Sequence, residues 1–136
     1  MNLPLIVAGS LAFLGAAIHG VAGEIFVVRK LSLGTLPASP FGGPGLTKAM
    51  IRAAWQMTTV AFLTVGCALL LSGTILDGDT ARGFALLAAG ASTGFAAIAV
   101  GLGAASTPWP PPRSMLLHPG PAVLTATAAL AWWGAL

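Results

Sequence analysis

Residues 82–105 have the sequence RGFALLAAGASTGFAAIAVGLGAA, in which Arg82 is the only charged residue. At 1.5 Å per residue, an α-helix of this length crosses the ~30 Å hydrocarbon core of a bilayer, which requires about 20 apolar residues. Because no water reaches that depth, a spanning segment must satisfy its backbone amides internally. This stretch therefore predicts a transmembrane helix.

Three further apolar runs have the same character: Leu3–Val28, Thr47–Leu71 and Ser114–Leu136. The strands of a membrane β-barrel would show alternating segments of about ten residues, and none is present. The first run lacks the preceding basic residues of a signal peptide, so we interpret it as a retained span. The sequence predicts an all-α, integral membrane four-helix bundle, a single domain over residues 1–136 with spans at 3–28, 47–71, 82–105 and 114–136.

The composition excludes several classes of protein. Of the 136 residues, 57% are hydrophobic and 7% are charged, and the mean hydropathy is +0.93, whereas a soluble domain carries about 25% charged residues. A soluble enzyme and a disordered tail are thereby excluded. The single cysteine, Cys67, rules out a disulfide scaffold. A net charge of +3 is too sparse for nucleic-acid binding, so the expected partners are the lipid bilayer and other membrane protein subunits.

The basic residues indicate how the chain is threaded. Five of them lie in or beside the connections that follow the first and third spans: Arg29, Lys30, Lys48, Arg52 and Arg113. The connection after the second span contains Asp77 and Asp79, with Arg82 at its edge. Cytoplasmic loops are enriched in Lys and Arg, so this asymmetry predicts that both termini lie on the non-cytoplasmic side.

Small residues are spaced so that they form one line along the third span: Gly83, Gly90, Gly94, Ala97 and Gly101. A similar line follows the first span: Ala8, Ala12, Gly15, His19 and Gly23. Membrane helices associate by close packing at small residues, since lipid is as apolar as a leucine side chain. We expect both lines to be buried against other helices.

A polar cluster is predicted where the first span ends and the second begins. In antiparallel spans Glu24 and Arg52 lie at similar depth, with His19 and Gln56 about one turn deeper and Trp55 beside Arg52. Ionisable residues inside a membrane are costly and indicate function by default. The prediction is a Glu24–Arg52 ion pair within one cluster. The alternative is that both charged side chains simply extend to the lipid headgroups.

His19 and His118 are the candidate cofactor ligands. Small residues around His19, among them Gly20 and Gly23, leave room for a flat macrocycle, and imidazole is a common axial ligand of haem iron. Haem or chlorophyll is therefore the possible cofactor. The alternative is a neutral core His19 and a His118 that only begins the fourth helix. No H-E-x-x-H motif or catalytic triad is present, so no metal site and no catalytic residue is predicted.

Four short motifs carry a resemblance: His19, Gly23-Glu24, Trp55-Gln56 and His118-Pro119. They resemble a pattern in small four-span bacterial membrane proteins of uncharacterised function, in which a Trp-His pair opens the second span. The resemblance implies a multi-pass protein of the bacterial inner membrane and supplies no activity. Gln56 replaces the histidine of that pair here, which removes one candidate ligand.

The chain lacks a catalytic set, a continuous polar path and a soluble domain. These absences favour a non-enzymatic accessory or assembly subunit of a larger bacterial membrane complex. The alternative is a small carrier or tetrapyrrole-binding membrane protein that uses the cytoplasmic-side polar cluster, for example to carry protons through Glu24 and His19.

The predicted threading can be tested by cysteine labelling in intact cells. A cysteine at position 79 is expected to react with an impermeant reagent added outside. A cysteine at position 39 is expected to react only after the membrane is permeabilised, because the basic connection lies in the cytoplasm. The reverse pattern would overturn the topology.

Overall fold

The computed structural model describes residues 1–106 and 119–136. Their main helices are α1 (Leu3–Ala17), α3 (Pro44–Thr74), α4 (Gly78–Ser106) and α6 (Pro119–Ala135). A π-helical turn (Ile18–Ala22) and the short α2 (Gly23–Phe26) continue α1. The described residues contain no β-strand beyond an isolated bridge between Ser39 and Gly42. The all-α prediction is confirmed.

Three helical segments are long and apolar enough to cross a membrane: Leu3–Lys30, Pro44–Thr74 and Gly78–Ala105. Large apolar side chains face outward along them, and Met57 and Leu87 are 71% and 77% exposed. Such an outer surface suits lipid. The predicted second and third spans lie within longer helices. The predicted fourth span begins in residues that the structure does not describe, and its described part, α6, has 17 residues.

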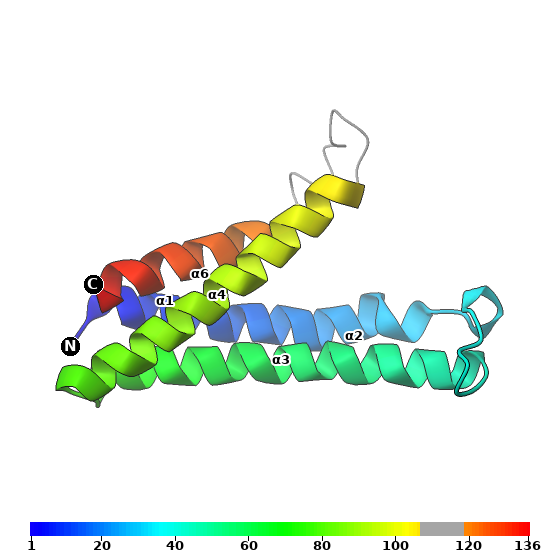
Figure 1. The fold of residues 1–136 in the computed structure, drawn as a ribbon, viewed down its shortest axis with the longest axis horizontal. Coiled ribbons are helices and arrows are strands. Elements are labelled where there is room, and N and C mark those ends of the chain that lie inside the picture. Colours follow the sequence, from blue (N-terminus) through cyan, green and yellow to red (C-terminus); the bar gives the residue numbers. More distant parts are fainter. Residues whose placement is uncertain (107–118) are drawn as a thin grey trace.

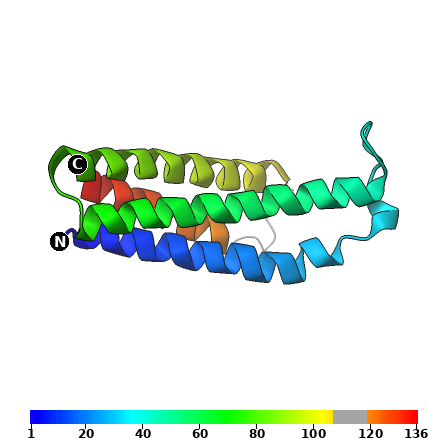
Figure 2. The same ribbon diagram turned by 90° about the horizontal axis from the view of Figure 1, so that it is seen from below.

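The four long helices contact one another in the cyclic order α1, α3, α4, α6. In Figure 1, α1 and α2 run beside α3, while α4 is inclined to this pair and α6 lies beside α4. Figure 2 shows both chain ends at the same end of the bundle. There the backbone N–H of Asn2 donates to the carbonyl of Gly73 (2.9 Å), and its side-chain amide donates to the carbonyl of Gly134 (2.8 Å). The basic α2–α3 connection lies at the opposite end.

The core is built mainly from alanine and glycine, so the helix backbones approach closely. A Cβ added to Gly66 would lie 2.8 Å from the Phe13 ring and 3.3 Å from the carbonyl oxygen of Gly9. A Cβ on Gly9 would in turn lie 3.0 Å from the carbonyl oxygen of Gly66. At these two glycines the backbones of α1 and α3 lie close together. Close van der Waals contact of this kind replaces hydrophobic burial as the main packing force in a membrane.

The glycine line of the third span does not pack against the other described helices of this chain. Within the described structure, nothing lies within 4 Å of a Cβ added at Gly83, Gly90, Gly94 or Gly101. The buried face of α4 is a different set of small residues: Ala85, Ala88, Ala89, Ser92 and Ala96. At 100° per residue these two lines lie on opposite sides of the helix. Alanine and serine are small enough for this contact, so the helix packs through them and leaves its glycines outward.

Candidate functional site

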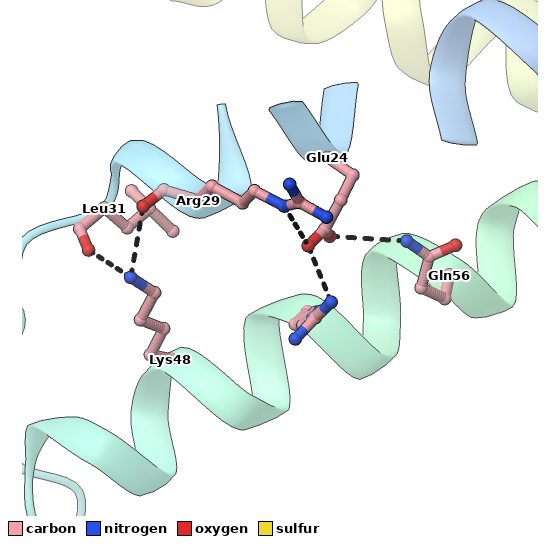
Figure 3. A network of polar contacts seen from close by, with 6 residues as sticks. Glu24, Arg29, Leu31, Lys48 and Gln56 are labelled. Carbon is pink, nitrogen blue, oxygen red and sulfur yellow. Dashed lines mark hydrogen bonds and ion pairs between the residues drawn. The ribbon is translucent and has the colours of Figure 1, made fainter. Parts of the chain in front are cut away.

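The predicted polar residues lie at the end of the bundle opposite the termini, between the α1–α2 segment and α3. Glu24 of α2 is buried, with 7% of its surface exposed. Its Oε1 atom lies 2.8 Å from Nη2 of Arg52 on α3. Its Oε2 atom is 3.4 Å from the side-chain amide of Gln56, which donates to it. Figure 3 shows Gln56 directed at Glu24 from the neighbouring helix.

Arg29 is a partner of Glu24 that the sequence did not indicate. Its Nε atom lies 3.5 Å from the same Oε1 atom that Arg52 contacts. The chain leaves α-helical geometry after Phe26 and forms a 3₁₀ turn at Val28–Lys30, which returns Arg29 toward Glu24 (Figure 3). Lys48 fixes this turn to α3, because its ammonium donates to the carbonyls of Arg29 (3.3 Å) and Leu31 (2.6 Å).

His19 belongs to a second, neighbouring group and is not bonded to Gln56. Its ring stacks on the Trp55 indole, with centroids 4.4 Å apart and planes 9° from parallel. The Trp55 Nε1–H donates to the backbone carbonyl of His19 (2.8 Å). The His19 Nδ1 atom lies 3.0 Å from Oγ1 of Thr59. The single cluster expected from the sequence is therefore two adjacent groups on the same pair of helices.

Thr59 has two hydrogen-bond neighbours at this point. Its hydroxyl donates to the carbonyl of Trp55 (3.2 Å), and its oxygen lies 3.0 Å from Nδ1 of His19. A hydroxyl can both donate and accept, so this contact suits either tautomer of the imidazole. Together with the stacked Trp55 ring, it fixes the orientation of the His19 ring.

Side chains of α3 fill the space that the sequence assigned to a macrocycle. A Cβ on Gly20 would lie 2.7 Å from the Thr59 methyl group, and a Cβ on Gly23 would lie 2.4 Å from Cζ2 of Trp55. The glycines beside His19 thus leave the space that the Thr59 and Trp55 side chains occupy. His19 and Gly20, which contact Trp55 and Thr59, lie in the π-helical turn at Ile18–Ala22. Such turns often occur at functional sites.

Aromatic rings extend from this group toward the centre of the bundle. The His19 ring meets Phe62 of α3 edge to face, with centroids 5.3 Å apart, and Phe62 meets Phe95 of α4 in the same way at 4.9 Å. Edge-to-face pairs are favourable because the positive ring edge faces the negative ring face. The site is therefore packed against α4 through Phe62 and Phe95.

The other candidate ligand, His118, lies outside the described residues. In the described part of the chain, no three His, Cys, Asp or Glu residues are grouped so that they could hold a metal ion. The arrangement provides one buried carboxylate with three polar partners and one imidazole held between Trp55 and Thr59. Comparisons with protein-family models, curated proteins and solved structures find no match to this chain.

A double-mutant cycle measures the Glu24–Arg52 contact. Glu24→Gln and Arg52→Gln are each expected to lower thermal stability in detergent, because each removes the 2.8 Å ion pair, and Arg52→Gln leaves the buried carboxylate with Arg29 as its one cationic partner. The double variant should recover part of the loss, with a coupling of at least about 0.5 kcal/mol. Effects that simply add would show that these side chains are only interfacial charges.

Proposed function

We propose that this chain is a non-enzymatic, four-span protein of the bacterial inner membrane that serves as an accessory or assembly subunit of a larger membrane complex. The single observation that carries the proposal is the outward glycine line of α4. A Cβ added at any of its four glycines would meet nothing within 4 Å in the other described helices, and the glycines lie opposite the face by which α4 joins the bundle.

Glycine lowers the stability of a helix, and a helix surface that meets only lipid gains nothing in return. Each glycine in a helix interior costs about 1 kcal/mol relative to alanine, and lipid does not require a surface without side chains. A partner helix does benefit, since its backbone can approach at Gly90 and Gly94, which form a GxxxG step. The line on α4 therefore supports contact with a helix of another subunit.

The proposed threading places both termini outside the cytoplasm and the Arg29–Arg52 end at the cytoplasmic face. Two features support it. The chain ends are hydrogen-bonded to α3 and to each other through Asn2. Four basic residues gather at the opposite end of the bundle: Arg29, Lys30, Lys48 and Arg52. The fourth span would contain α6, with the exposed Trp133 in the outer interface.

The test is the size of the complex in mildly solubilised native membranes. The tagged wild-type chain is expected to migrate on a native gel well above its monomer mass. Gly94→Leu should release it as a monomer while its melting temperature after purification does not fall, because a Cβ at Gly94 meets no other described part of the chain within 4 Å. Ala126→Leu, on the exposed face of α6, is the control and should leave the complex intact.

A wild-type chain that migrates as a lone monomer would contradict the proposal. So would a Gly94→Leu variant that migrates like the wild type. A visible absorption spectrum of the same preparation addresses the competing tetrapyrrole-binding function, for which a Soret band would be required.

A further inference from the structure

The basic end of the bundle holds more positive charge than its one acid can balance. Arg29 and Arg52 both contact Oε1 of Glu24, at 3.5 Å and 2.8 Å. The charged nitrogens of the two side chains are therefore no farther apart than the sum of these distances. One carboxylate balances one guanidinium, so this pair retains an excess positive charge. Lys30 and Lys48 lie close by in the sequence and add to that excess.

The two guanidinium groups are held in place yet remain open. The Glu24 side chain that anchors them is 10% exposed, whereas those of Arg29 and Arg52 are 67% and 58% exposed. Arg29 contacts Glu24 through Nε and Arg52 through Nη2, so most of the five N–H donors of each group stay free of the carboxylate. A guanidinium fork matches the oxygens of a phosphate.

An exposed apolar surface of α3 begins next to Arg52 and continues toward the middle of the helix. Five residues of α3 form it: Ala53, Gln56, Met57, Val60 and Ala61. The surface is open and only slightly hollowed, and Met57 and Val60 are more than half exposed. The side-chain amide of Gln56 donates to Glu24, which joins this surface to the arginine pair. The charged head and the apolar tail of a lipid would therefore meet the arginines and this surface side by side.

We infer that this end of the bundle binds an acidic phospholipid, with its phosphate between Arg29 and Arg52 and an acyl chain along the exposed apolar surface of α3. Basic pockets at the cytoplasmic ends of membrane helices recognise anionic headgroups through this charge complementarity. Glu24 acts as the positioning residue, because it holds both arginines at one point. The inference does not depend on the glycine face of α4.

The test uses the purified full chain in neutral detergent, with bound lipid counted by native mass spectrometry. Phosphatidylglycerol is expected to remain bound where phosphatidylcholine with the same acyl chains does not. Arg29→Gln keeps the 2.8 Å Glu24–Arg52 pair and so preserves the fold. It should weaken phosphatidylglycerol binding about fivefold, the effect of losing roughly 1 kcal/mol of attraction.

Two controls make the result specific. Arg82→Gln removes one exposed positive charge at the opposite end of the bundle and should leave binding unchanged. Ala53→Phe places a bulky ring on the apolar surface beside Arg52 and should weaken phosphatidylglycerol binding while Arg29 and Arg52 stay in place. Equal binding of the two lipids, or equal effects of Arg29→Gln and Arg82→Gln, would overturn the inference. Inorganic phosphate that competes at the same concentration as the lipid would identify free phosphate as the ligand and would also overturn it.

Discussion

The contact on which the structure depends is the seam between α1–α2 and α3, where glycines on one helix receive the backbone or side chains of the other. Gly9 and Gly66 face each other near the termini, and Gly20 and Gly23 receive Thr59 and Trp55 near the basic end. In a membrane, burial of apolar surface from water cannot hold helices together, so this close packing supplies the attraction. Each position works only because a Cβ is absent.

The functional residues are arranged by the same seam. Trp55 lies against Gly23, stacks on His19 and donates to the His19 carbonyl. With that contact made, Arg52 and Gln56, which lie about one turn apart on α3, both face Glu24. The buried carboxylate then holds Arg29 as well. Close packing at the glycines therefore sets the positions of the polar groups. The polar groups in turn join the 3₁₀ turn to α3.

The sequence predicts the helices well, because continuous apolar runs of sufficient length have one stable form in lipid. It also places Glu24 and Arg52 together, since matched depth on antiparallel helices follows from the helical rise alone. Two features could not be predicted. The turn that returns Arg29 to Glu24 depends on a local departure from α-helical geometry after Phe26. The choice of packing face on α4 depends on tertiary contacts, because alanine and glycine lines both satisfy the small-residue rule.

The most direct test of the seam is the sign of a glycine-to-alanine change measured by thermal unfolding in detergent. In a helix interior this change normally stabilises, by about 1 kcal/mol. Gly90→Ala on the open face of α4 should therefore raise the melting temperature. Gly23→Ala should lower it, because the new Cβ would lie 2.4 Å from the Trp55 ring. A Gly23→Ala variant that melts at or above the wild-type temperature would contradict the account.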